Sequence, residues 1–226
     1  TIKCLQYEGI RVGLCRNELT TLKKTTVVTL LSEVFPNFGL IKDEHYKYNP
    51  IEGKITFYNK SEIVFQELRH IPSDPNYTRL GGLLLTFAVI DEAGETEAKG
   101  KEILQSRIGR WRNESYRIKP LLIMTCNPSR NFLYDDFYLA DKEGTLPYYR
   151  KFVNATGLDN PYLSEAYIEN LKRTLTPSEV NRLLLGNWES QDDPDNLVSS
   201  DDIFEMYDHS INMNDDDTRY ISADIA

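Results

Sequence analysis

The stretch Leu83-Leu84-Leu85-Thr86-Phe87-Ala88-Val89-Ile90-Asp91-Glu92 decides the fold of this chain, because a mostly apolar run leads directly to two adjacent carboxylates. Such a run predicts a strand buried on both faces, as in a parallel sheet. Ligands of these sheets gather where the strands end, so both acids are expected there. Asp91 would then hold Mg²⁺, and Glu92 would orient or deprotonate the water that attacks a γ-phosphate. The alternative is a buried strand followed by a helix cap, since Asp and Glu are also favoured near a helix N-terminus.

A second apolar run, Leu121-Leu122-Ile123-Met124, ends in Thr125-Cys126-Asn127-Pro128. If the two runs are neighbouring parallel strands, Asn127 lies near Asp91 and Glu92. A neutral amide there can sense a γ-phosphate or its attacking water through hydrogen bonds. An Asn-Pro turn at the end of a strand is the alternative interpretation, and such turns are common.

Strands and helices alternate along the rest of the sequence, which predicts an α/β domain with a largely parallel sheet. Thr176 and Pro177 are residue types favoured at the N-cap and at the first position of a helix. The other expected strands are 10–15, 54–58, 62–67 and 120–126, and the expected helices are the last turns of one at 1–7, then 19–34, 96–112, 164–174 and 177–185.

The composition is that of an ordinary globular protein, with 40% hydrophobic and 11% aromatic residues among 226. No apolar stretch approaches the roughly 20 residues that a membrane helix needs. The three cysteines and three histidines are scattered, so neither a disulfide framework nor a zinc site is expected. A reducing cytoplasm fits this cysteine usage best.

The net charge of −9 is unevenly distributed along the chain. Residues 189–217 hold eleven acids and no Lys or Arg, whereas residues 1–188 hold 25 basic and 23 acidic side chains. Residues 190–196 of this acidic segment are typical of a flexible, solvated linker, whereas Ile203-Phe204 and Met206-Tyr207 suggest a short helix that packs against a domain. A basic stretch at 99–119, with Trp111 and Tyr116 interleaved, is suited to contact phosphates, and a solvated helix face is an equal alternative.

Further motifs accompany the two strand ends in a fixed order. They are Gly9-Ile10-Arg11-Val12-Gly13-Leu14-Cys15-Arg16, Leu80-Gly81-Gly82, Ser106-Arg107-Ile108-Gly109-Arg110, Asp159-Asn160-Pro161-Tyr162-Leu163, Gly186-Asn187-Trp188-Glu189 and Ser222-Ala223-Asp224. With these motifs the chain resembles the large terminase subunit of tailed double-stranded DNA bacteriophages, the motor that packages the viral genome. The resemblance implies an ATPase (motor) domain at 1–188, of the P-loop NTPase (ASCE-like) type, an acidic linker at 189–217, and the first strand of a truncated, RNase H-like nuclease domain at 218–226.

The resemblance also implies roles at the two strand ends. Asp91 matches the Walker B acid that binds Mg²⁺ with ATP, and Glu92 matches the catalytic glutamate. Thr125 and Asn127 belong to the coupling motif that links hydrolysis to DNA movement.

Two further roles lie outside the strand ends. Arg79 stands where family members place an arginine that reaches the neighbouring subunit's nucleotide, where a guanidinium would stabilise transition-state charge. Arg107 is a rival for this role, and an ordinary exposed loop charge is the other interpretation of Arg79. Asp224 matches the first acid of the nuclease, in which several carboxylates bridge Mg²⁺ or Mn²⁺ ions.

The function implied is an ATP-hydrolysing motor that moves double-stranded DNA into the procapsid. The expected partners are DNA, the portal protein, the small terminase subunit and further copies in a ring, with no membrane. The protein is expected in the host cytoplasm, docked on the procapsid during packaging, and absent from the mature virion.

The sequence lacks a glycine-rich phosphate-binding loop with Lys, and the other nuclease acids would lie beyond Ala226. We therefore expect the 226 residues alone to be a poor ATPase and no nuclease. Two alternatives remain open: another nucleotide hydrolase of this sheet class, such as a helicase, and a non-enzymatic interaction module whose acids cap a helix.

Overall fold

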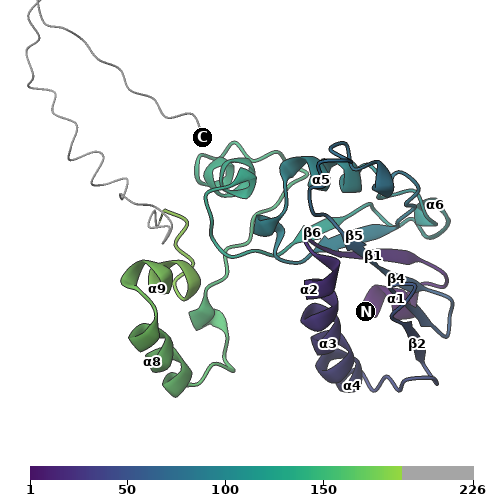
Figure 1. Ribbon diagram of the computed structural model, residues 1–226, viewed down its shortest axis with the longest axis horizontal. Helices are drawn as coiled ribbons and strands as arrows, with labels where there is room; N and C mark the ends of the chain where they lie inside the picture. Colours follow the sequence, from purple (N-terminus) through teal and green to yellow (C-terminus); the bar gives the residue numbers. More distant parts are fainter. Residues whose placement is uncertain (190–226) are drawn as a thin grey trace, which may run out of the picture.

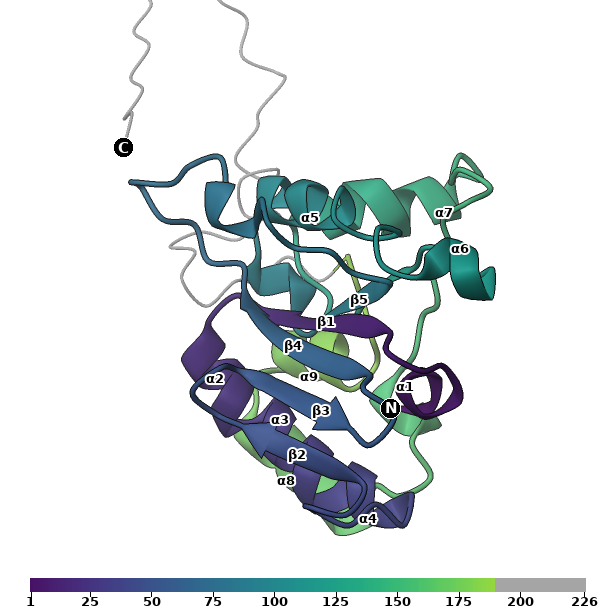
Figure 2. The same cartoon turned by 90° about the vertical axis from the view of Figure 1, so that its right-hand side faces the viewer.

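A six-stranded sheet in the order β2-β3-β4-β1-β5-β6 forms the centre of the molecule (Figure 1). The computed structural model describes residues 1–189. Strands β4, β1, β5 and β6 are parallel, whereas β2 and β3 pair in antiparallel fashion at one side (Figure 2). The predicted α/β class with a largely parallel sheet is confirmed. Asp224, the predicted strand 218–226 and all of the acidic linker except Glu189 lie outside the described residues.

The four parallel strands were expected, although two are shorter than predicted. Strand β5 begins at Phe87, because the backbone of Thr86 binds Arg11 and that of Leu85 forms only an isolated bridge to Ile108. Strand β2 was not predicted. The strands are β1 (Arg11–Arg16), β2 (Tyr46–Asn49), β3 (Lys54–Phe57), β4 (Glu62–Glu67), β5 (Phe87–Ile90) and β6 (Leu122–Met124).

The helix predicted at 19–34 is divided into several pieces. Thr25 has φ −114° and ψ −80°, outside the helical region, and it lies in a run of threonines and valines, which lower helix propensity. The pieces are α2 (Leu19–Lys24), α3 (Thr26–Thr29), a π-helical turn η1 (Leu30–Val34) and α4 (Phe35–Asn37). Figures 1 and 2 show these pieces stacked along one face of the sheet.

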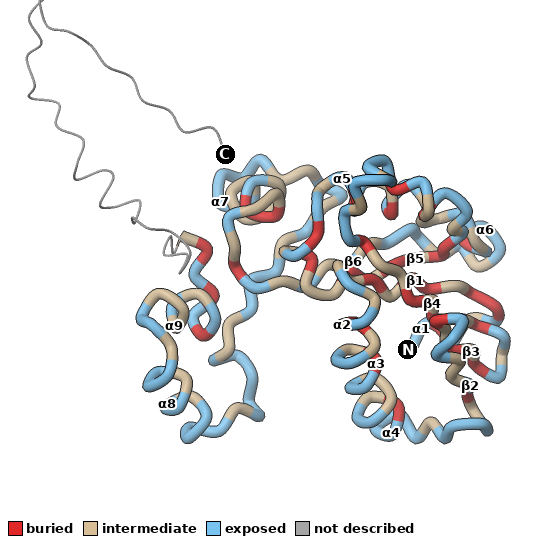
Figure 3. The backbone as a smooth tube through the Cα atoms, viewed as in Figure 1, coloured by how far each residue is buried: buried red, intermediate tan, exposed pale blue. Residues whose placement is uncertain are grey.

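The opposite face is covered by α5 (Ala98–Gln105), which ends well before the predicted residue 112. The chain turns at Gly109, where φ is +83°, and returns to the sheet. Each face has its own buried cluster, and Figure 3 shows the buried residues concentrated along the central strands. The sheet is therefore a two-sided core whose strand ends remain accessible.

The remaining short helices connect these layers and lead into the C-terminal part. The predicted helices at 164–174 and 177–185 are confirmed as α8 and α9, and Thr176 caps α9 through a bond from the backbone of Glu179. The short elements are α1 (Ile2–Gln6), η2 (Thr78–Leu80), η3 (Ala93–Glu95), α6 (Asn113–Tyr116), η4 (Tyr134–Leu139), α7 (Ala140–Lys142), η5 (Gly157–Asp159), α8 (Glu165–Thr174) and α9 (Pro177–Leu183).

The segment after α9 is anchored on η4 and α7. Trp188 stacks on Tyr138, with ring centroids 5.5 Å apart and planes 10° apart. The Glu189 carboxylate accepts bonds from Lys142 at 2.7 Å, from Tyr134 at 2.9 Å and from Tyr138 at 3.2 Å. These bonds, the Lys142 bond foremost, lower the pKa of Glu189 to about 2. Within residues 1–189, every helix is too short or too polar to cross a lipid bilayer.

Candidate functional site

The four parallel strands end side by side, and their register places one polar side chain from each in a single row. Arg16 pairs with Glu67 of β4. The pairing of β1 with β5, continued by one residue, brings Arg16 beside Asp91, and the pairing of β5 with β6 brings Asp91 beside Thr125 in the same way. Residues that lie opposite one another in neighbouring strands point to the same face of the sheet. The row Glu67, Arg16, Asp91, Thr125 therefore lies on the face that α2–α4 cover.

Both oxygens of the Asp91 carboxylate are bound. Oδ2 accepts a bond from Oγ1 of Thr26 at 2.5 Å and lies 3.5 Å from Nη1 of Arg16. Oδ1 accepts a bond from Oγ1 of Thr125 at 3.1 Å. Carboxylate and hydroxyl oxygens are the hard donors that Mg²⁺ prefers, so the donor set around Asp91 fits this ion.

Glu92 follows Asp91 in a left-handed backbone conformation, with φ 49° and ψ 54°. This conformation is uncommon for a residue with a side chain and directs the chain sharply into η3. The next residue fixes the turn, because the backbone N–H of Ala93 donates to the carbonyl of Thr125 at 2.7 Å. The chain therefore turns away from β5 directly after Asp91.

The surroundings of Glu92 favour its protonated form. Partial burial raises the pKa of Glu92, and the charge of Asp91 raises it further, while the backbone N–H of Asn127 acts in the opposite direction. A carboxylate with a raised pKa is a better proton acceptor near neutral pH than an ordinary glutamate. The surroundings of Glu92 thus make its carboxylate more basic than that of an ordinary glutamate.

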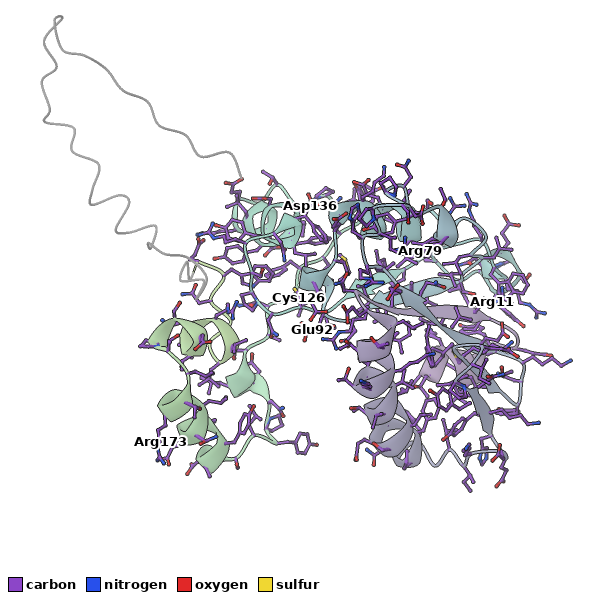
Figure 4. The ribbon with its side chains drawn as sticks, viewed as in Figure 1. Arg11, Arg79, Glu92, Cys126, Asp136 and Arg173 are labelled. Atoms are coloured by element: carbon purple, nitrogen blue, oxygen red, sulfur yellow. The ribbon has the colours of Figure 1, made fainter. Side chains whose placement is uncertain are left out.

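The structure brings two predicted residues that follow β6, Thr125 and Asn127, to the acid pair. Thr125 contacts Asp91 through its side chain, and Asn127 contacts Glu92 through its backbone. Both of these residues are exposed at the strand end. Cys126 lies between them, beside Glu92 in Figure 4, and burial raises the pKa of its thiol to about 11, so it is a poor nucleophile.

An apolar cavity of about 470 Å³ opens beside the polar row, on the same face of the sheet. Its walls include Val12, Leu14, Phe87 and Val89, and Asp91 lines it as well. Ile123 of β6 and the preceding Leu121 are also open to solvent, with 44% and 52% of their surface exposed. The edge of this sheet therefore has an uncovered apolar face that leads to the acid pair.

The two arginines considered for contact with a neighbouring subunit's nucleotide, Arg79 and Arg107, make their bonds away from the acid pair. Arg79 forms an ion pair with Asp74 at 2.9 Å, stacks over Tyr77 at 4.7 Å and donates to the carbonyl of Arg69. Arg107 donates to the carbonyl of Gly81 at 3.0 Å. Figure 4 shows Arg79 well away from Glu92. Within residues 1–189 the structure records no bond from either arginine to the acid pair.

Two residues of the basic stretch 99–119, Lys101 and Trp111, make internal contacts. Lys101 is 5% exposed and pairs with Asp136 at 3.4 Å. Trp111 packs beneath Arg11 at 4.3 Å and donates to the carbonyl of Gly9 at 2.8 Å. Lys99, Arg110, Arg112, Arg117 and Lys119 of the same stretch are exposed, so contact with phosphates and a solvated surface both remain predictions for it.

Sequence reasoning missed two residues that contact Asp91. Arg16 follows the apolar run of β1 as Asp91 follows that of β5, so the same strand-end rule identifies it. Thr26, which directly follows the break in the helix at Thr25, reaches Asp91 from 65 residues away, and sequence periodicity does not show this contact. In the described part of the chain no group of three or more His, Cys, Asp or Glu is arranged to hold a metal. A Mg²⁺ ion at Asp91 would thus take further ligands from water and phosphate, as this ion usually does.

Neither a protein-family model nor a curated protein matches the sequence, but solved structures match the fold. The large terminase from a thermophilic bacteriophage matches with a TM-score of 0.63 and 17% identity, over 82% of this chain and 42% of that chain. The same terminase in complex with ADP matches with a TM-score of 0.62 and 18% identity, over 82% of this chain and 42% of that chain. The complex of this terminase with ATP-γ-S matches with a TM-score of 0.57 and 16% identity, over 82% of this chain and 41% of that chain.

These identities are low, and the similarity they establish is one of fold. This chain spans less than half of the length of the terminase chain that it matches. The predicted resemblance to large terminases is confirmed at the level of the fold.

Proposed function

We propose that this chain is part of an ATP-hydrolysing motor for viral DNA packaging. The observation that carries the proposal is the acid pair at the end of β5, where Asp91 has the oxygen surroundings of a Mg²⁺ ligand and the adjacent Glu92 those of a proton acceptor. The chain shares its fold with a phage large terminase that has been solved with ADP and with ATP-γ-S. ATP and Mg²⁺ are the ligands that this combination favours.

The residues of the site would divide the chemistry between them. Asp91 would hold Mg²⁺, which neutralises phosphate charge, and the hydroxyl of Thr125 would keep the Asp91 carboxylate oriented. Glu92 would bind the attacking water and take its proton. Asn127, whose backbone already contacts Glu92, would respond to the γ-phosphate through its amide and pass the change into the loop that follows.

The proposed site requires a phosphate-binding loop that these 226 residues do not contain. The apolar cavity beside Val12 and Phe87 ends at Asp91, so a segment that lies in it would deliver such a loop to the acid pair. We assign this place to the glycine-rich loop and its following helix.

The resemblance supplies the remaining parts of the proposal. Double-stranded DNA is the translocated partner, and the portal protein, the small terminase subunit and further copies of the chain complete the motor on the procapsid in the host cytoplasm. Arg79 would act on the nucleotide of a neighbouring copy. Asp224 would belong to a Mg²⁺- or Mn²⁺-dependent nuclease.

The test uses an extended version of the protein that carries a phosphate-binding loop before Thr1. We expect it to hydrolyse ATP, and we expect Glu92→Gln to lower kcat by about 10²-fold or more while ATP affinity changes little, because only proton transfer is lost. Glu102→Gln, on the exposed side of α5, is the matched control and should leave kcat unchanged.

Turnover that persists in Glu92→Gln would contradict the role of this residue. An extended protein that unwinds duplex strands would be a helicase rather than a packaging motor. Absence of nucleotide binding in the extended protein would favour a non-enzymatic module.

A further inference from the structure

Arg16 occupies the centre of the polar row, at the carboxyl end of the central strand β1. Its side chain is 13% exposed. Nε and Nη2 donate to the two carboxylate oxygens of Glu95, at 3.3 Å and 3.1 Å. Nη1 donates to Oγ1 of Thr25 at 3.2 Å and lies 3.5 Å from Oδ2 of Asp91. One guanidinium therefore joins β1, the start of α3, the end of β5 and the turn η3.

Arg16 contacts residues on both sides of Glu92 in the sequence. Asp91 precedes Glu92, Glu95 follows it by three residues, and both carboxylates face Arg16. Backbone bonds of Asp91 to Cys15 and of Ala93 to Thr125 fix the loop on the adjacent strands. The side chain of Arg16 joins Asp91 to Glu95 across the loop, in addition to the turn's own bond from the backbone N–H of Glu95 to the carbonyl of Glu92 at 3.0 Å.

Charge gives Arg16 a second effect on this loop. Asp91, Glu92 and Glu95 surround it, and the bond to Glu95, with the charges of all three acids, raises its pKa, so the guanidinium stays protonated. Without this cation, three neighbouring carboxylates would repel one another, and the loop would open toward solvent to separate them.

We propose that Arg16 is the positioning residue of the hydrolytic site, which holds the loop 91–95 so that Glu92 faces the place of the attacking water. The catalytic consequence rests on the proposed function, whereas the order of the loop does not. The planar guanidinium binds Glu95 with two parallel bonds and still reaches Asp91, whereas a lysine ammonium offers a single point of charge. Arg16→Lys should consequently restore only part of what Arg16→Ala loses.

Strand β1 provides a matched control. Arg11 lies at the other end of the strand, is also ion-paired, to Glu62 at 2.8 Å, and lies far from Glu92 in Figure 4. A variant at either position removes one ion-paired arginine from the same strand. Only the variant at Arg16 should affect the loop 91–95.

The first measurement is hydrogen exchange on the 226-residue chain, read by mass spectrometry in peptides that cover 91–96. We expect Arg16→Ala to accelerate exchange there by at least about tenfold, Arg16→Lys to accelerate it less, and Arg11→Ala to leave it unchanged. Unchanged exchange in both Arg16 variants, or equal acceleration in Arg11→Ala, would overturn the proposal. If Arg16→Ala does not fold, the exchange rate of peptides 91–96 in Arg16→Lys tests the proposal, and an unchanged rate overturns it.

The second measurement is the rate of ATP hydrolysis by the extended protein. We expect Arg16→Ala to lower kcat by about tenfold or more, with KM for ATP within about twofold, because the base is misplaced while the nucleotide still binds. A merely structural role would lower the folded fraction and leave kcat per folded molecule unchanged, which would overturn the proposal. If the unaltered extended protein hydrolyses no ATP, the proposed function fails, and the exchange measurement still decides the role of Arg16 in the loop.

Discussion

Strand β1 carries an arginine at each end, and the surroundings of the two differ. At the amino end, Arg11 pairs with Glu62 and stacks on Trp111, so one cation meets one acid and one ring. At the carboxyl end, Arg16 faces three acids, and one of them, Glu92, has a raised pKa.

The polar residues near the two arginines also differ, in burial and in hydrogen bonding. Behind Arg11, the fully buried hydroxyl of Thr86 accepts from the backbone N–H of Arg11 at 3.2 Å and donates to the carbonyl of Trp111 at 2.7 Å. Behind Arg16, Thr125 and Asn127 are exposed. Paired polar groups stabilise one end of the sheet, and surplus charge at the other is available for chemistry.

The largest effect on stability is expected at the amino end. Thr86→Val keeps the shape of the side chain but leaves the backbone N–H of Arg11 and the carbonyl of Trp111 without this hydroxyl. We expect a loss of about 2 kcal/mol in the free energy of unfolding and a melting temperature lower by about 4–8 °C, measured by calorimetry. Thr20→Val, at an exposed position of α2, is the control. A decrease no larger than that of the control would show that the amino end does not depend on this bond.

A smaller effect of opposite sign is expected at the carboxyl end. The pKa of Glu92 is higher in the folded chain than its ordinary value of 4.5, so the folded state is disfavoured once the pH exceeds both values. Glu92→Gln should therefore raise the melting temperature by about 1–2 °C at pH 8. The gain should disappear at pH 4, where the carboxyl is largely protonated in both states. A lower melting temperature at pH 8 would mean that this end, too, is built for stability.

The smallest effect concerns an acid that is fully paired. The pKa of Glu189 is lowered to about 2, so its contribution to stability is complete above the ordinary value of 4.5 and is lost as the pH falls from there toward 2. Because the group is exposed, Glu189→Gln should lower the melting temperature at pH 7 by only about 0.5–1 °C. The difference from the unaltered chain should shrink at pH 3. Glu143→Gln, at an exposed acid directly after α7, is the control, and a difference independent of pH would exclude an ionic origin.

The sequence predicted the carboxyl end better than the amino end, and physical reasons explain this. An apolar run fixes where a buried strand ends, and parallel strands align these ends, so Asp91, Glu92, Thr125 and Asn127 could be placed together in advance. At the amino end, Thr86 and Trp111 meet through a loop whose path depends on tertiary contacts. No periodic pattern marks such a contact.

The errors inside the predicted elements have a similar origin. The apolar stripe of 19–34 continues through Thr25, so periodicity alone does not show the break before Thr26, which reaches Asp91. Strand β2 has four residues, too few for an alternating pattern to stand out. Arg16 was accessible to the strand-end rule, but its role depends on Glu95, whose position follows from the turn η3.

The backbone of Glu92 also has a consequence for which amino acids can occupy this position. At φ 49° the chain favours Gly, Asn or Asp and disfavours β-branched residues. A library randomised at position 92 and selected only for folding should accordingly enrich glycine and asparagine, whereas, under the proposed function, a library of the extended protein selected for ATP hydrolysis should return glutamate. One backbone angle thus separates selection for stability from selection for chemistry.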